Sequence, residues 1–246
     1  KQDVEEQIHG DLIEAGIKTL SIVGNDSAKR IGTNLNYVQT QLEAFAFQVQ
    51  RQYNETPAGK ILETGKRSSL VNLDVLKTTR ERQPFLGGLL YLPDNVSAQE
   101  NLLALSTLGK VQPSLVDLTK ESHSIAWLTF IAFETGLYFL YPPPRGELAE
   151  DFDPRIRPWY RDGKLVDGIR QTPVYIGASS QKAVLSFTRR LLDSEGTVLG
   201  VAGVDCLLSD VINLPPIPSE WQQEAEVKII RLQGTDAKKA VFTVTA

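Results

Sequence analysis

The feature that most constrains the fold is the segment Asp151–Tyr160, which reads Asp-Phe-Asp-Pro-Arg-Ile-Arg-Pro-Trp-Tyr. Pro154 and Pro158 hold their own φ angles near one value, and each disfavours the helical region for the residue before it. The segment is therefore predicted to be a stiff, non-helical loop. In an extended backbone, Arg157 and Trp159 lie two residues apart and point the same way, so a guanidinium and an indole would face one partner.

Two interpretations of this pair remain open. Arg157 can form two hydrogen bonds to a ligand carboxylate while Trp159 stacks on the ligand. Alternatively, Arg157 stacks on Trp159 to close off a core, with Asp153 as its ion-pair partner. The residue types of the segment do not decide between a binding role and a structural one.

Runs of β-branched and aromatic residues predict strands on both sides of this segment. Residues 125–133 and 137–141 flank Glu134-Thr-Gly136 and predict a hairpin with glycine at its turn. Upstream, residues 85–91 read as one strand with a glycine kink. The strands predicted after the segment are 173–176, 183–192 and 197–207. Five antiparallel strands around the segment, with helices to one side, predict an α+β fold with a PAS-like sheet.

The N-terminal part of the chain is predicted to be helical. Residues 3–23 follow an amphipathic pattern that breaks near Gly24-Asn25-Asp26, and Ser27 is suited to cap a second helix. Apolar residues of this second helix step alternately by four and three positions, as in a heptad seam. The seam residues are Ile31, Leu35, Val38, Leu42, Phe45 and Val49. Such a seam packs on its own domain or pairs with a second copy of the chain, and we expect a mixture of the two.

Composition and motifs exclude several functional classes. A net charge of −4 and a pI near 5.4 do not favour nucleic-acid binding. His9 and His123 lie far apart, and no histidine or cysteine cluster has the spacing of a metal site. Because nucleotide-binding loops and a nucleophile elbow are also missing, neither an enzyme nor a cofactor is expected. The longest apolar run, 125–133, is far shorter than the roughly 20 residues of a membrane span. The single cysteine, Cys206, lies in an apolar strand pattern and is predicted to be buried.

Several motifs, in order, resemble the double Cache family, the extracytoplasmic sensor domains of bacterial receptors. The run Asp153-Pro-Arg-x-Arg-Pro-Trp-Tyr160 resembles the signature of that family. Gly136-Leu-Tyr-Phe-Leu-Tyr-Pro142 upstream, and Val174-Tyr175 and Gly200-Val-Ala-Gly-Val-Asp205 downstream, are similar to its neighbouring strands. Together the matches cover roughly residues 125–208.

The resemblance implies an organisation in three parts. Residues 1–55 would form a helical stalk, 56–213 a membrane-distal ligand-binding lobe, and 214–246 a partial or minimal membrane-proximal lobe. The chain would be the periplasmic or extracellular portion of a membrane-anchored receptor, with a homodimer formed through the N-terminal helix. For the output we expect a sensor histidine kinase first, a methyl-accepting chemotaxis receptor second and a cyclic-dinucleotide enzyme third. An interaction module without a ligand is the alternative of a different class.

The resemblance also implies a ligand site. In the amino-acid-binding branch of the family, the loop arginine and tryptophan hold the ligand carboxylate, while tyrosines and aspartates of later strands hold the amine. The matching residues here are Arg157, Trp159, Tyr160, Tyr175 and Asp205. Two positions depart: Phe152 replaces a tyrosine and Gly177 replaces an aspartate. Because groups that would hold an ammonium are lost, we expect a small carboxylate-bearing or amino-acid-like ligand. Asp205 alternatively bonds to the backbone of a neighbouring loop.

Overall fold

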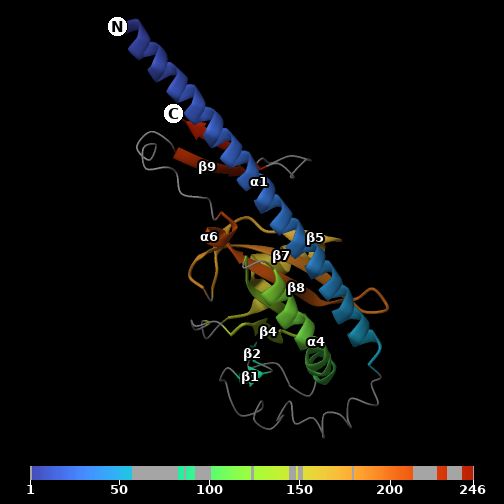
Figure 1. Ribbon diagram of the computed structural model, residues 1–246. Coiled ribbons are helices and arrows are strands. Elements are labelled where there is room, and N and C mark those ends of the chain that lie inside the picture. The colour runs from blue at the N-terminus through green and yellow to red at the C-terminus, as the bar shows by residue number, and fades with distance from the viewer. Residues whose placement is uncertain are drawn as a thin grey trace. The chain divides into compact units, whose positions relative to one another are not determined.

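The computed structural model describes residues 2–56, 83–85, 87–91, 101–122, 125–143, 148, 152–178, 180–212, 226–231 and 240–245. The chain divides into two compact units (Figure 1). One unit comprises residues 37–211 and contains most of the predicted ligand-binding lobe. The other comprises residues 1–36 and 212–246. The three-part division made from the sequence stays a prediction.

The N-terminal helix α1 runs without interruption over Gln2–Asn54. The predicted break near Gly24-Asn25-Asp26, with Ser27 as a new cap, is therefore wrong. One interior glycine costs a helix only about 1 kcal/mol. Starting a second helix requires a new and unfavourable nucleation step, which continuation avoids. Residues 24–27 are weak helix formers, but they consequently remain part of the continuous helix.

The C-terminal part of α1 packs within the unit 37–211. The seam residues Val38, Leu42 and Val49 are fully buried within a single chain. The polar flank of the same stretch is tied to the sheet, because Glu43 accepts a hydrogen bond from Arg189 Nε at 3.0 Å. This stretch of the seam serves its own domain. Pairing of α1 with a second copy stays a prediction.

The core of the unit is an antiparallel sheet of eight strands. Its strands are β1 (Gln83–Phe85), β2 (Gly88–Tyr91), β3 (Ala126–Phe133), β4 (Tyr138–Tyr141), β5 (Ile169–Gln171), β6 (Tyr175–Ile176), β7 (Ala183–Leu192) and β8 (Val198–Leu207). Their order in the sheet is β1-β2-β4-β3-β8-β7-β5, and β6 pairs with the other end of β7. The α+β class and the antiparallel sheet agree with the prediction.

Two details of the strand prediction are wrong. Residues 85–91 are not one kinked strand, because β1 and β2 pair as a tight hairpin in which Phe85 is opposite Gly88. Gly87 lies in the turn with φ of 75°, a conformation that glycine adopts at little cost. The sheet also has more strands than the five expected. The three-residue strand β5 is too short to produce an alternating pattern that a sequence can reveal.

Helices cover one face of this sheet (Figure 1). Helix α4 (Leu102–Glu121) contacts β3, and the Thr119 hydroxyl lies 2.8 Å from that of Thr129. The 37–54 part of α1 lies on the same side, where Tyr53 stacks on Phe133 with ring centroids 6.5 Å apart. The opposite face carries the 3-10 turn η1 (Pro154–Ile156) and helix α5 (Pro158–Leu165). The proline-rich segment therefore lies on the face that α1 and α4 leave open.

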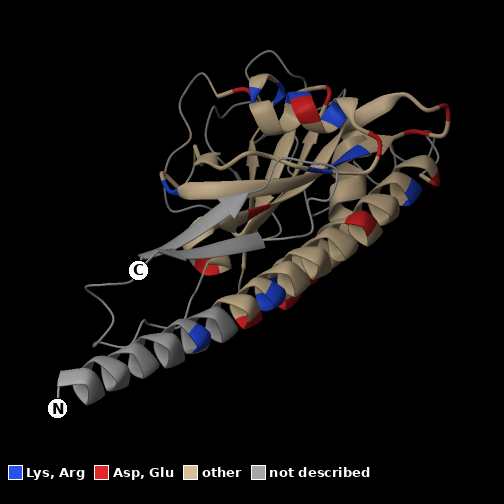
Figure 2. Cartoon of the chain, turned by 90° about the horizontal axis from the view of Figure 1, so that it is seen from above, with Lys and Arg blue, Asp and Glu red and all other residues tan. Residues whose placement is uncertain are grey.

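Charged side chains are concentrated on helices and turns, and few occur along the strands (Figure 2). Asp205 in β8 is an exception, because it is a buried carboxyl within an otherwise apolar strand. Such a group is costly to bury, which makes its surroundings informative about function.

The other unit contains a two-stranded antiparallel sheet. Its strands β9 (Glu226–Arg231) and β10 (Ala240–Thr245) pair along their whole length.

Candidate ligand-binding site

The proline-rich segment was predicted to be a non-helical loop, and this is wrong, because it contains a 3-10 turn and the start of a helix. The residues before the prolines are extended, with φ of −125° and ψ of 119° at Asp153 and φ of −73° and ψ of 144° at Arg157. Pro154 begins η1 and Pro158 begins α5. Proline is favoured at the first position of a helix, where its missing N–H would have had no partner. Trp159 is consequently helical, and the expected parallel direction of Arg157 and Trp159 in an extended chain is wrong.

Asp153 pairs with Arg155 and not with Arg157, the partner considered from the sequence. Its carboxylate accepts hydrogen bonds from the Arg155 backbone N–H at 2.8 Å and from Arg155 Nη2 at 2.7 Å. The Arg155 side chain thereby holds the pKa of Asp153 below its usual value. This local pair leaves Arg157 without Asp153 as a partner.

Arg157 lies beside the ring of Phe152, with its guanidinium carbon 5.9 Å from the ring centroid. Its Nε is buried and has no hydrogen-bond partner among the described residues. A buried donor without a partner costs free energy, and an anion that accepts its hydrogen bond removes that cost. The position of Arg157 thus suits a ligand carboxylate.

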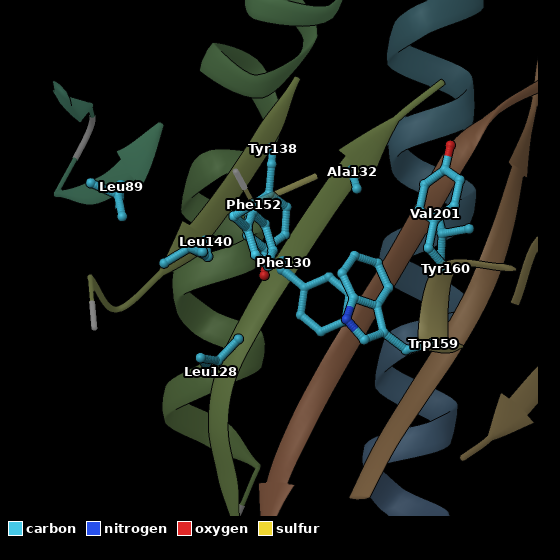
Figure 3. Close-up of a cluster of buried hydrophobic side chains, with 10 residues drawn as sticks. All are labelled: Leu89, Leu128, Phe130, Ala132, Tyr138, Leu140, Phe152, Trp159, Tyr160 and Val201. Atoms are coloured by element: carbon cyan, nitrogen blue, oxygen red, sulfur yellow. The ribbon is translucent and has the colours of Figure 1, made fainter. Parts of the chain in front are cut away.

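Trp159 is part of an aromatic cluster on the open face of the sheet. Only 5% of its surface is exposed, and its ring lies 4.5 Å from that of Phe130 and 5.9 Å from that of Tyr138. Phe152 completes the cluster, with its ring 5.6 Å from Tyr138 (Figure 3). We call Phe130, Tyr138, Phe152 and Trp159 the aromatic cluster.

Two features of the strands keep this cluster in place. Gly203 on β8 leaves room for the Phe130 ring, since a Cβ at this glycine would lie 2.3 Å from Phe130 Cζ. The Tyr91 hydroxyl donates a 2.6 Å hydrogen bond to the carbonyl oxygen of Phe152. Strand β2 thereby holds the start of the proline-rich segment against the sheet.

Asp205 lies opposite Ser186 on β7 and Leu128 on β3. Its carboxylate accepts hydrogen bonds from the Ser186 hydroxyl and, at 3.4 Å, from the Tyr175 hydroxyl. Burial raises the pKa of Asp205 to about 6, although both hydrogen bonds act in the opposite direction. The partners are side chains of neighbouring strands, so the alternative in which Asp205 bonds to a loop backbone is not observed.

Arg157 and Asp205 influence the same two phenols. Burial raises the pKa of Tyr138 and of Tyr175, the negative charge of Asp205 raises both further, and the positive charge of Arg157 lowers both. Both charges are therefore near both hydroxyls, yet no ion pair joins Arg157 to Asp205 within the described part of the chain. Such a cation and anion, each acting on the same two tyrosines, can each take an opposite group of one small ligand.

Tyr160 is not brought together with these groups. Its side chain is fully buried, and its hydroxyl donates a 3.0 Å hydrogen bond to Glu134 in the turn between β3 and β4. Lys164 donates to the same carboxylate oxygen at 3.2 Å. These contacts attach α5 to the β3–β4 turn, which is a structural role.

Gly177 ends β6 and closes the turn into β7. Its N–H donates to the Lys182 carbonyl at 2.9 Å, and its carbonyl accepts from the Gln181 N–H at 2.9 Å. A Cβ here would lie 2.5 Å from the Ser180 hydroxyl oxygen. The position contributes turn geometry and no side chain.

Three residues of this region were missed from the sequence: Tyr91, Tyr138 and Ser186. Alternation along β2, β4 and β7 assigns side chains to a face, but it does not reveal which strands are neighbours.

No protein-family model matches the chain. The sequence is 30% identical over 169 residues to the methyl-accepting chemotaxis protein PscA of Pseudomonas syringae pv. tomato, a match that covers 68% of this chain and 25% of PscA. It is 32% identical over 71 residues to the methyl-accepting chemotaxis protein McpG of Pseudomonas putida, which covers 29% of this chain and 11% of McpG. The chain thus spans about a quarter of PscA and less of McpG.

Among solved structures, the ligand-binding domain of the Pseudomonas aeruginosa amino acid chemoreceptor PctC, in complex with GABA, superposes with a TM-score of 0.47 at 15% identity. That match covers 79% of this chain and 65% of PctC's. The ligand-binding domain of the Pseudomonas fluorescens chemoreceptor CtaA, in complex with L-isoleucine, gives a TM-score of 0.44 at 19% identity over 83% of this chain and 62% of CtaA's.

Within the described residues, no helix has both the length and the apolar character that crossing a membrane requires. The sequence relatives are named as chemotaxis proteins and not as enzymes. The receptors to which the chain is similar in sequence are methyl-accepting chemotaxis proteins, the class that was expected second from the sequence.

Proposed function

We propose that this chain is the ligand-sensing domain of a methyl-accepting chemotaxis receptor and that it binds a small amino-acid-like carboxylate. The observation that carries the proposal is the pair of unmatched charges beside the aromatic cluster. Among the described residues, Arg157 Nε is buried without a partner, and buried Asp205 has only neutral hydroxyl partners. A buried charge without an opposite partner costs free energy, so stability alone does not explain either group.

The ligand is oriented by these two charges. Its carboxylate lies against the Arg157 guanidinium, and its apolar part rests on the aromatic cluster, which provides a flat, desolvated surface. An ammonium group, where the ligand has one, lies toward Asp205. The amino-acid ligands named for the solved chemoreceptor domains are consistent with this arrangement.

The output follows from the sequence relatives and differs from our first expectation. A histidine kinase was expected, but the related receptors are methyl-accepting chemotaxis proteins. We therefore propose a chemotaxis output, with this domain outside the cytoplasmic membrane. Signalling requires only that the ligand binds one arrangement of the domain more tightly than the other, by about 1–3 kcal/mol on the usual scale of coupled sites.

A binding screen tests the proposal. The purified domain is heated with each of the twenty L-amino acids, GABA, acetate, butyrate and succinate, and hits are measured by titration calorimetry. A true ligand raises the melting temperature at concentrations above its dissociation constant. No hit at millimolar concentrations would contradict the proposed function and favour an interaction module without a ligand.

Two site variants and one control variant then test the site. Arg157→Ala should abolish binding of every hit. Arg161→Ala removes the same charge from an exposed position on α5 and should leave binding unchanged. Asp205→Asn should weaken hits that carry an ammonium group and spare plain carboxylates. Binding that survives Arg157→Ala would show that the site lies elsewhere.

A further inference from the structure

Tyr138 lies within the influence of both charged groups of the site, because the charges of Asp205 and Arg157 both act on its pKa. It lies on β4 opposite Ala132 of β3, and Ala132 is in turn opposite Val201 of β8. Paired residues of an antiparallel sheet have their side chains on the same face. Two-residue alternation along β8 assigns Asp205 to the face of Val201, so Tyr138 and Asp205 share the open face.

The Tyr138 side chain also extends along that face toward Asp205. In Figure 3 it runs from β4 toward Leu128, with its hydroxyl at the end nearest that residue. Leu128 is the β3 residue directly opposite Asp205. The Tyr160 hydroxyl points the other way in the same view, which agrees with its hydrogen bond to Glu134.

The ring of Tyr138 contacts both aromatic residues that accompany Arg157. It stacks on Trp159 with the ring planes 28° apart, and it lies 5.6 Å from Phe152, whose ring is beside the Arg157 guanidinium. Phe152 has no hydroxyl of its own to offer a ligand. Tyr138 therefore brings a phenolic hydroxyl to a region where Phe152 provides only an apolar ring.

The Tyr138 hydroxyl makes no hydrogen bond to another group in the described part of the chain. No hydrogen bond contributes to its raised pKa, whereas hydrogen bonds contribute for Tyr160 and Tyr175. Its neighbour Asp205 already accepts from Ser186 and Tyr175. Because burial and the charge of Asp205 both disfavour loss of its proton, the phenol stays protonated and is a hydrogen-bond donor.

We propose that Tyr138 is a ligand-binding residue whose hydroxyl donates a hydrogen bond to the carboxylate that Arg157 holds. This inference rests on the proposed function and adds to it a specificity-determining group outside the sequence motif. A neutral hydrogen-bond donor beside Arg157 favours an anionic oxygen at this end of the ligand. An ammonium group of the ligand can then bind only at the Asp205 end of the site.

The experiment compares Tyr138→Phe with Tyr160→Phe, which removes a hydroxyl from another buried tyrosine of the same domain. For ligands from the panel above, Tyr138→Phe should raise the dissociation constant about tenfold, the usual effect of losing one hydrogen bond to a charged group. The same fold-change is expected for every panel member that binds, because all share the carboxylate. Tyr160→Phe should leave the dissociation constant within about twofold of the wild type.

Melting temperatures without ligand separate binding from structure. Tyr138→Phe should melt within about 2 °C of the wild type because no internal hydrogen bond is lost, and Tyr160→Phe should melt several degrees lower. Unchanged affinity in Tyr138→Phe, together with lost affinity in Arg157→Ala, would overturn this inference alone. A melting temperature for Tyr138→Phe as low as that of Tyr160→Phe would also overturn it. Absence of binding to the wild type would instead remove the proposed function, and this inference with it.

Discussion

Asp205 should make the ligand-free domain less stable as the pH rises. Its pKa is about 6 in the folded domain, against 3.8 for an unperturbed aspartate. A carboxyl with a raised pKa binds its proton more tightly in the folded state, so folding is favoured at low pH and penalised once the group ionises. The penalty develops as the pH rises from about 4 and is complete above about 6.

The magnitude follows from these two values. At about pH 7.5 the penalty is about 3 kcal/mol, and at about pH 5, where most of the folded domain is still protonated, it is about 1.6 kcal/mol. The wild-type domain should therefore lose about 1.4 kcal/mol of unfolding free energy between about pH 5 and about pH 7.5 from this group alone.

Urea denaturation at both pH values measures this loss, with Asp205→Asn as the control. The asparagine keeps an oxygen that can accept from Ser186 and Tyr175, but it cannot ionise. The variant should be more stable than the wild type at the higher pH, with a smaller advantage at the lower pH. Asp153 does not interfere, because its lowered pKa confines its effect to pH values below its usual one. If the variant were more stable than the wild type by the same amount at both pH values, the conclusion that Asp205 is a buried carboxyl with a raised pKa would be refuted.

Three further variants test the packing. Gly200→Ala should cost about 1–3 kcal/mol or more in urea denaturation, because its Cβ would lie 2.1 Å from the Ala132 carbonyl oxygen. Gly32→Ala is the opposite case: nothing lies within 4 Å of its Cβ position in α1, so the variant should be more stable by about 0.5–1 kcal/mol. Tyr160→Phe should lose about 1 kcal/mol, since its partner Glu134 is partly exposed and solvent weakens the bond. A neutral result for Gly200→Ala, a destabilised Gly32→Ala or a fully stable Tyr160→Phe would each contradict the packing described.

The strand pairs that are close in the chain could be predicted because their signals are local. Residues 125–141 consist of two β-branched and aromatic runs around a glycine turn, and they form the hairpin β3–β4. The two long strands separated by residues 193–197 form the hairpin β7–β8 in the same way. Two such runs with turn residues between them define a hairpin without any knowledge of the rest of the molecule.

For the site, only the types of residue involved could be predicted from the sequence. Prolines 154 and 158 set the backbone of the residues before them, so the extended conformation of Arg157 follows from the chain itself. The helix that begins at Pro158 was missed because the same proline that disfavours helix before it is also a favoured first residue of one.

The sequence by itself determined the α+β class, the hairpins and the presence of an arginine and a tryptophan on a proline-braced segment. The tertiary structure decided which tyrosine faces the charged groups: Tyr138 extends toward Leu128, the β3 residue opposite Asp205, whereas Tyr160 binds Glu134. Local patterns depend on steric limits within a few residues, and they are the same in any fold. The neighbours of a side chain depend on strand register and on which helix packs on which face, and these are set by contacts between residues far apart in the chain.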